Sequence, residues 1–151
     1  MQFDIVTTEK PTPADREAIL APLIAYNDRY AGPSGYKPLA LLLRDPSGKT
    51  IGGLSARSQY DWLYIELLSI PEELRRKGVG SDLIRRAETV AAERGCVGVW
   101  LDTYEFQARG FYEKLGYEIF GTLDDHLRGS SLFLSQAAAC GSYDSMNSLR
   151  R

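Results

Sequence analysis

The chain has 151 residues, of which 44% are hydrophobic and 25% are charged, and its formal net charge at pH 7 is −2. This length and composition are those of one soluble globular domain with a substantial core. The small negative charge argues against nucleic acid as a main partner, and no apolar run approaches the roughly 20 residues that span a bilayer. We therefore expect no nucleic-acid partner and no membrane partner.

The first residues, Met-Gln-Phe-Asp-Ile, lack the basic start and the apolar core of a signal peptide. The two cysteines, Cys96 and Cys140, show neither metal-ligand spacing nor a disulfide framework. We therefore expect no bound metal and a location in the reducing cytoplasm.

The N-terminal part of the chain predicts one strand and one helix. Residues Phe3–Thr7 alternate weakly between apolar and polar side chains and are expected to form a strand. Thr12, a capping residue, precedes Pro13, so a helix should start here and run to about residue 30. Pro22 should bend or divide this helix. The apolar side chains at three-and-four spacing are expected in the core: Ile19, Leu20, Leu23 and Ile24.

Three strands joined by short turns follow the helix. Mostly apolar segments at Pro38–Arg44, Thr50–Tyr60 and Trp62–Ile70 are separated by breaker residues, which predicts an antiparallel meander. Within the second segment, Gly52 and Gly53 indicate a bend or a close approach of two backbones.

A short basic turn with two glycines links the third strand to a helix. The turn reads Arg75-Arg76-Lys77-Gly78-Val79-Gly80. Because glycine has no Cβ, Gly78 and Gly80 allow positive φ and can turn backbone amides toward one point. Amides at a helix N-terminus bind phosphate oxygens, and three adjacent cations attract anions. The turn lacks the spacing of a Walker loop and the third glycine of the dinucleotide fingerprint. It is therefore either a pyrophosphate cradle or an ordinary strand-to-helix turn with a solvated basic face.

The second half of the chain predicts a strand-helix-strand unit. A helix over Val79–Arg94 leads into a strand at Cys96–Leu101, which should lie parallel to Trp62–Ile70 because such crossovers close right-handed. The carboxyl ends of the two strands would splay beside the basic turn and leave a crevice for a ligand. The remaining expected elements are a helix at Phe106–Leu115 and strands at Tyr117–Leu123 and Leu132–Leu134.

Together these elements predict an α/β fold. Its central sheet should be mixed and mostly antiparallel, with one parallel strand pair splayed beside the basic turn and helices on the flanks. We expect one domain over residues 1–136, followed by a flexible C-terminal tail at 137–151 that shows no periodicity.

The order strand, Arg-x-x-Gly-x-Gly turn, helix and strand, followed by the stretch from Ala108 to Tyr117, resembles the GNAT family of acetyl-CoA-dependent N-acetyltransferases. The resemblance is specific over Leu63–Tyr117. It implies the α+β, sandwich-like GNAT fold and acetyl-CoA as the co-substrate. The turn would hold the coenzyme pyrophosphate, and the main chain of the preceding strand would pair with the pantetheine arm. The coenzyme-binding residues that follow from this resemblance are Leu68, Ser69, Ile70, Arg75, Arg76, Lys77, Gly78, Val79, Gly80, Ser81 and Ala108.

Acetyl transfer to an amine needs a proton acceptor for the amine and a proton donor for the departing thiolate. Glu66 is the only charged residue of its strand, and GNAT enzymes often carry a glutamate there, so it is the first candidate base. A glutamate at a strand bulge, held for structural reasons, is the alternative. Asp102, at the end of the adjoining strand, is the second candidate base. Tyr112 lies one helical turn after the small Ala108, and the resemblance implies that its phenol is the general acid; core packing is the alternative.

Other polar residues are harder to place. Glu105 stands where many family members have Asn, and we expect it to face solvent or the acceptor. The segment 124–131 has no family signature and is either a solvated acidic loop or a contributor to the binding of a cationic acceptor. His126 is expected at the surface. Cys96 is expected in the core rather than as a nucleophile.

These features predict an N-acetyltransferase that moves acetyl from acetyl-CoA to a primary amine of a small molecule by direct attack in a ternary complex. The alternatives are a non-catalytic acyl-CoA-binding or regulatory module, an enzyme that acetylates a protein amine, and an interaction domain that uses Arg75–Lys77 as a surface patch. A homodimer through the C-terminal strands is the assembly that the resemblance suggests.

Overall fold

The structure is a computed structural model that describes residues 1–139, and the chain divides into two compact units, Met1–Ser34 and Gly35–Arg151. The predicted tail at 137–151 starts too early, because the last strand continues to Ala138. The rest of that tail, with Cys140, lies outside the described residues. The expectation of one domain over 1–136 stays a prediction.

The first unit contains one helix, α1 (Pro13–Ala31). Its start is fixed by a capping box, in which the Thr12 hydroxyl accepts the Asp15 N–H at 3.2 Å and the Asp15 carboxylate accepts the Thr12 N–H at 2.7 Å. The helix therefore begins where the sequence predicts, and it continues through Pro22 without dividing.

Two expectations are not met within the first unit by itself. Residues Phe3–Thr7 form no strand, because this unit contains no other strand with which they could pair. The unit by itself also gives α1 no core: none of the helix residues is buried, and Ile19 is 75% exposed. This unit has no sheet of its own on which the stripe could pack.

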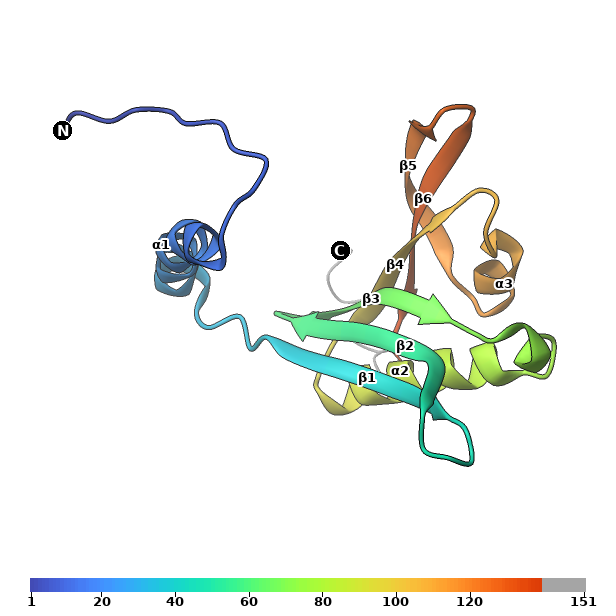
Figure 1. The fold of residues 1–151 in the computed structure, drawn as a ribbon. Coiled ribbons are helices and arrows are strands. Elements are labelled where there is room, and N and C mark those ends of the chain that lie inside the picture. The colour runs from blue at the N-terminus through green and yellow to red at the C-terminus, as the bar shows by residue number, and fades with distance from the viewer. Residues whose placement is uncertain (140–151) are drawn as a thin grey trace, which may run out of the picture. The chain divides into compact units, whose positions relative to one another are not determined.

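The second unit is built on one six-stranded sheet, shown in Figure 1. Its strands are β1 (Lys37–Arg44), β2 (Thr50–Gln59), β3 (Trp62–Ser69), β4 (Gly98–Tyr104), β5 (Glu118–Leu127) and β6 (Ser130–Ala138). Their order in the sheet is β1-β2-β3-β4-β6-β5, and every neighbouring pair is antiparallel except β3 with β4. The predicted mixed, mostly antiparallel sheet with one parallel pair is confirmed.

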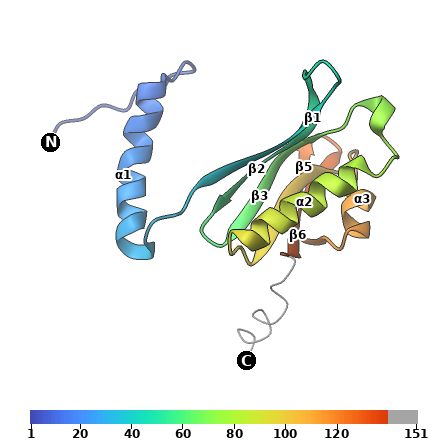
Figure 2. The ribbon, with the colours of Figure 1, turned by 90° about the horizontal axis from the view of Figure 1, so that it is seen from below.

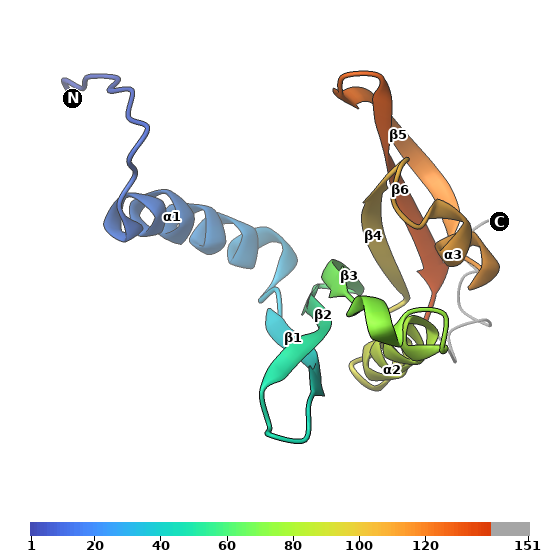
Figure 3. The ribbon, with the colours of Figure 1, turned by 45° about the vertical axis from the view of Figure 1, so that its right-hand side comes forward.

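The helix α2 (Val79–Glu93) covers one face of this sheet (Figure 2). Its buried side chains pack on buried residues of β2, β3 and β4 and are Leu83, Ile84, Ala87 and Ala91. The short helix α3 (Arg109–Lys114) lies beside β5 and β6 in Figures 1 and 3 and contributes to the same core. A 3-10 turn at Glu72–Leu74 precedes α2.

The parallel strands separate halfway along their length. The pairing of β3 with β4 runs only from Trp62 opposite Gly98 to Ile65 opposite Leu101. The register of β2 against β3 shifts at the same level, since Ala56 faces Ile65 whereas Ser55 faces Leu67. Glu66 is therefore the extra residue of a β-bulge, the kind of irregularity that re-aims side chains and ends pairing. The sheet opens at this level, as the sequence predicts.

The C-terminal hairpin is longer than expected. Residues 124–127 belong to β5 rather than to a solvated loop, although the register is irregular there and Asp125 has φ of 52°. Glu105 is exposed, in agreement with the expectation that it faces solvent, and its carboxylate accepts the backbone N–H of Ser131 at 3.3 Å. The second half of the hairpin could not be predicted, because the sequence of this segment shows only a weak alternation of apolar and polar residues.

Candidate active site

A cleft of about 1100 Å³ opens where β3 and β4 diverge, between the start of α2 and the helix α3. Every residue predicted for the site lines it except Lys77, which is exposed and lies outside the lining. The lining residues that the sequence did not indicate are Leu67, Leu74, Thr103, Tyr104, Gln107, Phe111 and Lys114. The roles of the predicted residues stay predictions, but the fold brings them to one place.

The basic turn has the backbone geometry of an anion cradle. Gly78 caps α2 with φ of 81°, a left-handed conformation that glycine adopts without strain. Arg76 has φ of 60°, which is unfavourable for a residue with a Cβ, and such strain concentrates at functional sites. The Arg75 guanidinium donates from Nε to the carbonyl of Ile70 at 3.1 Å, so it ties the turn to the end of the strand.

Gly80 serves a different purpose from the one expected. It lies in the first turn of α2 and does not adopt positive φ. A Cβ at this position would lie 3.1 Å from Cζ of Phe111, closer than side chains normally approach. The glycine therefore lets α3 pack against the N-terminus of α2, and this packing shapes one wall of the cleft.

The residues that the sequence did not indicate follow from two local features. Strand β4 runs three residues beyond its predicted end at Leu101, which brings Thr103 and Tyr104 into the lining. The side-chain oxygen of Gln107 accepts the backbone N–H of Tyr104 at 2.9 Å and so ends the strand. Lys114 supplies a cation from α3, on the wall opposite the basic turn. Gln107, three residues after the end of β4, was the only local feature of the sequence that could have indicated that these residues line the cleft.

Tyr112 is both a core residue and a cleft residue. Only 8% of it is exposed, and its ring makes edge contacts with Phe111 at 5.0 Å and with Tyr117 at 6.0 Å between centroids. Burial raises the pKa of the Tyr112 phenol, and the negative charge of Asp102 raises it further. The hydroxyl is therefore neutral near pH 7 and can donate a proton or a hydrogen bond.

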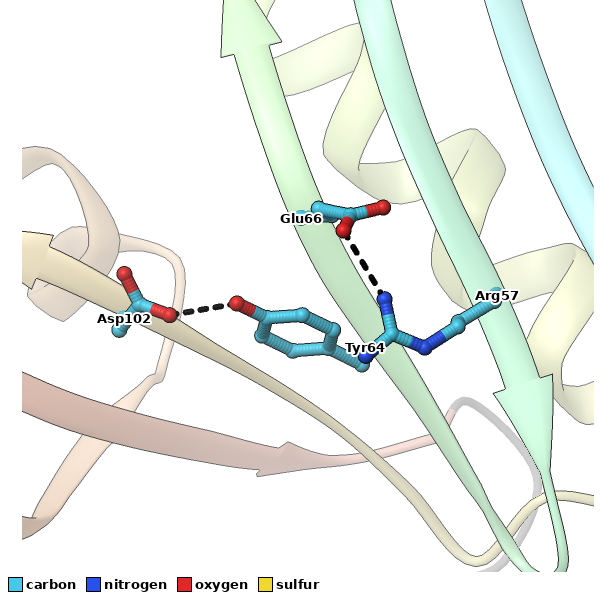
Figure 4. A network of polar contacts seen from close by, with 4 residues as sticks. All are labelled: Arg57, Tyr64, Glu66 and Asp102. Carbon is cyan, nitrogen blue, oxygen red and sulfur yellow. Dashed lines mark hydrogen bonds and ion pairs between the residues drawn. The ribbon is translucent and has the colours of Figure 1, made fainter. Parts of the chain in front are cut away.

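The two candidate bases have different surroundings, as Figure 4 shows. Glu66 lies at the bulge, and 48% of its side chain is exposed. One carboxylate oxygen of Glu66 forms an ion pair with Nη1 of Arg57 at 3.1 Å. Asp102 instead accepts a hydrogen bond from the Tyr64 hydroxyl at 2.6 Å.

The Tyr64 phenol is held in its neutral form. Burial, followed by the hydrogen bond to Asp102 and the charge of that carboxylate, raises the pKa of Tyr64 to about 12. The ring stacks on Trp100 with 4.2 Å between centroids, and the guanidinium carbon of Arg57 lies 4.7 Å from the Tyr64 ring centroid.

The raised pKa of Tyr64 predicts a stability loss at alkaline pH. Below pH 10 the phenol is protonated in both the folded and the unfolded chain, and its contribution to the free energy of unfolding is fully present. As the pH rises toward about 12, the unfolded chain loses the proton first, so the free energy of unfolding falls. Because Tyr64 is only partly buried, we expect its contribution to the free energy of unfolding to be about 1 kcal/mol after screening. Urea unfolding at pH 9 and pH 11.5 should show a smaller pH-dependent loss in Tyr64→Phe than in the wild type. The exposed residue Tyr60, changed to phenylalanine, is the control; equal losses in all three proteins would contradict the prediction.

The remaining polar residues singled out in the sequence lie outside this chemistry. Cys96 is buried in the core, as expected, and burial raises the pKa of its thiol, which makes it a poor nucleophile. His126 is exposed and makes an edge contact with Tyr104 at 5.4 Å between centroids. Within residues 1–139 no cluster of three or more potential metal ligands occurs, and none of the helices there has the length and apolar character that crossing a bilayer requires.

The fold and the cleft define a class of protein. A strand that opens into a basic glycine turn, a helix N-terminus aimed at a cleft, and a buried phenol on the opposite wall suit the binding of a phosphate-bearing ligand beside an acid–base centre.

Comparisons with known proteins identify this class. The model of the Acetyltransferase (GNAT) family matches residues 5–117, and the chain belongs to this family. Acetyltransferase Atu2258 of Agrobacterium fabrum strain C58 is 35% identical over 116 residues, which cover 77% of this chain and 85% of that protein. The blasticidin-S acetyltransferase of Streptomyces morookaense is 41% identical over 83 residues, covering 54% of this chain and 61% of that protein.

A solved structure agrees with these relatives. The crystal structure of an Agrobacterium tumefaciens protein assigned to the acetyltransferases superposes with a TM-score of 0.86 at 31% identity, covering 90% of this chain and 99% of that one. The fold is therefore the GNAT fold, and the activity is acetyl transfer of the GNAT type.

Proposed function

We propose that the protein transfers the acetyl group of acetyl-CoA to a primary amine of a small molecule, by direct attack in a ternary complex. The observation that carries this proposal is the cleft itself, which joins the basic turn at one end to Tyr112 and two carboxylates at the other. A single cleft can thus hold a phosphate-bearing coenzyme and its reactive thioester beside the groups that move protons.

The coenzyme would bind along the open edge of β3. Because β4 leaves β3 after Ile65, the main-chain groups from Leu68 to Ile70 have no strand partner on that side and can pair with the pantetheine amides. The amides at the start of α2 and the guanidinium groups of the basic turn would hold the pyrophosphate. The other proposed contacts are Ser69, Val79, Gly80, Ser81 and Ala108, all in the lining.

The chemistry needs a neutral amine and a stabilised thiolate. An amine with an ordinary pKa of about 10.4 costs roughly 4–5 kcal/mol to deprotonate at pH 7, so a carboxylate that receives a proton is useful. Glu66 and Asp102 both line the cleft and are the candidates for this base. Tyr112 would give its proton to the departing thiolate, and its neutral, buried phenol suits that role.

The acceptor is proposed to be a small cationic molecule. The blasticidin-S acetyltransferase, the relative with 41% identity over 83 residues, carries the name of a small-molecule substrate, and the carboxylates of the cleft would attract a cation. An acceptor of this kind enters as an ammonium and needs the base described above.

The proposal is tested by calorimetric titration with acetyl-CoA and with free CoA, followed by a screen of small amines, blasticidin S among them, for CoA release. Micromolar binding of both coenzyme forms, and CoA release with at least one amine, is the expected result. If neither form binds at millimolar concentration, the basic turn is only a turn and the proposal fails.

A further inference from the structure

Two carboxylates reach the cleft from neighbouring strands, but they are not equivalent. The charge of Glu66 is compensated by the Arg57 guanidinium, which lies within 3.1 Å and is itself held on β2. Asp102 instead accepts a hydrogen bond from the neutral phenol of Tyr64. In the described part of the chain no basic side chain forms an ion pair with Asp102. The negative charge of Glu66 therefore has a cation paired with it, whereas that of Asp102 has none in the described part of the chain.

Tyr64 fixes one oxygen of Asp102 and leaves the other available. The hydroxyl bonds to Oδ2 at 2.6 Å, and the Tyr64 ring is held by the stack on Trp100 and by the Arg57 guanidinium over it (Figure 4). A ring restrained in this way loses little further freedom when a ligand binds, so the carboxylate is preorganised. Oδ1 of Asp102 makes no hydrogen bond within residues 1–139.

The face of β4 around Asp102 is aromatic. Trp100, Asp102 and Tyr104 alternate along the strand and therefore share one face. Tyr104 also lines the cleft, and its ring stacks on Phe106 with 5.1 Å between centroids. A carboxylate between aromatic rings suits an ammonium ion, because the charge pairs with the carboxylate while the rings favour a cation at their faces.

Asp102 also lies near the proposed acid. Its charge acts on the phenol of Tyr112, and both side chains line the cleft. The groups that bind the amine, accept its proton and protonate the thiolate would then converge at one end of the cleft.

We propose that Asp102, and not Glu66, binds the ammonium of the acceptor and receives its proton, that Tyr64 is a positioning residue for this carboxylate, and that the acceptor is a primary alkylammonium with an aromatic or apolar body. This inference rests on the proposed function. The ammonium docks on Oδ1 of Asp102, which takes one proton from it and releases that proton to solvent. The amine nitrogen then attacks the thioester carbon and, as the C–N bond forms, passes a second proton to Asp102. The C–S bond breaks, and the thiolate takes the proton of Tyr112. Transfer from Asp102 to the Tyr112 phenolate through solvent restores both groups, so one proton is released for each amide formed.

The test uses phenethylamine as the probe and 2-phenylethanol as its uncharged analogue, with binding followed by NMR titration of the full chain in the presence of CoA. We expect phenethylamine to bind the wild type. Its Kd should rise roughly 10-fold or more in Asp102→Asn and several-fold in Tyr64→Phe, and should change less than twofold in Glu66→Gln. Asp102→Asn should weaken the binding of 2-phenylethanol far less than that of phenethylamine, because the alcohol carries no charge.

Steady-state kinetics are measured with an amine that gives CoA release in the screen. They report changes in kcat/KM and KM that a merely structural role of these residues would not produce. Asp102→Asn should lower kcat/KM for the amine about 100-fold. Tyr64→Phe, which keeps the stacked ring, should mainly raise KM for the amine and leave KM for acetyl-CoA unchanged. Thermal unfolding of each variant checks the fold.

The outcomes separate this inference from the proposed function. If acetyl-CoA binds but phenethylamine does not, or if Glu66→Gln loses the probe while Asp102→Asn retains it, the assignment of Asp102 is overturned. If acetyl-CoA itself does not bind, the proposed function fails.

Discussion

Replacing Tyr112 with phenylalanine is expected to lower kcat about 100-fold or more while the affinity for acetyl-CoA changes little. The substitution removes one hydroxyl from a residue that is only 8% exposed and keeps the ring contacts with Phe111 and Tyr117. A positioned general acid contributes roughly 10²-fold to 10⁴-fold to a rate, and the Tyr112 phenol is a buried, ionisable donor in the cleft lining whose raised pKa keeps it neutral near pH 7. Steady-state kinetics with the amine from the screen, together with a coenzyme titration, measure both quantities.

Tyr117→Phe is the matched control for this prediction. Tyr117 is also a buried tyrosine, but it lies outside the cleft lining, and its hydroxyl bonds to Glu88 at 3.1 Å. Loss of that bond leaves a half-buried carboxylate without its donor and should lower the free energy of unfolding by about 1–3 kcal/mol, with kcat nearly unchanged. Unchanged turnover in Tyr112→Phe, or an equal loss in both variants, would remove Tyr112 from the acid role.

Reversing the charge of Arg76 is expected to raise the Kd for CoA at least about 10-fold. Arg76 lines the cleft at the start of α2, where the coenzyme phosphates are proposed to bind, and a charge-assisted hydrogen bond to phosphate contributes roughly 1.5–3 kcal/mol. Calorimetry of Arg76→Glu at low and at moderate salt measures this loss.

The neighbouring residue offers a control with the same change of charge. Lys77 was predicted to bind the coenzyme but lies outside the cleft lining, so Lys77→Glu should weaken CoA binding only slightly and mainly at low salt. If both variants lose affinity equally, the three basic residues act as a diffuse patch. That result would favour the alternative of an interaction domain over a pyrophosphate-binding turn.

The sequence already indicated the end of the cleft where the coenzyme is proposed to bind. The Arg-x-x-Gly-x-Gly turn, the helix that follows it, and the spacing of Ala108 and Tyr112 are local features, and each is decided by residues within a few positions of one another. Helix starts and glycine turns depend mostly on such short-range rules, so the positive φ of Gly78 and the start of α2 at Val79 were predictable.

The sequence was less informative where a segment needs a distant partner. Residues Phe3–Thr7 alternate as a strand would, yet the unit Met1–Ser34 holds no second strand that could complete a ladder. The second half of β6 shows little apolar alternation, yet it pairs with both β4 and β5 and is a full strand. Strand formation depends on neighbours that periodicity does not reveal.

The sequence by itself determined the class of fold, the basic glycine turn before α2 and the place of Tyr112 on the helix after Ala108, because these follow from residue order and local spacing. Only the tertiary structure decided what surrounds each carboxylate. Tyr64 and Asp102 are 38 residues apart and meet because β3 and β4 are parallel neighbours that diverge just beyond them. Arg57 reaches Glu66 because a bulge in β3 shifts the register with β2. A sequence shows that two acids exist, but the sheet register decides which one is paired with a cation and which one with a neutral phenol.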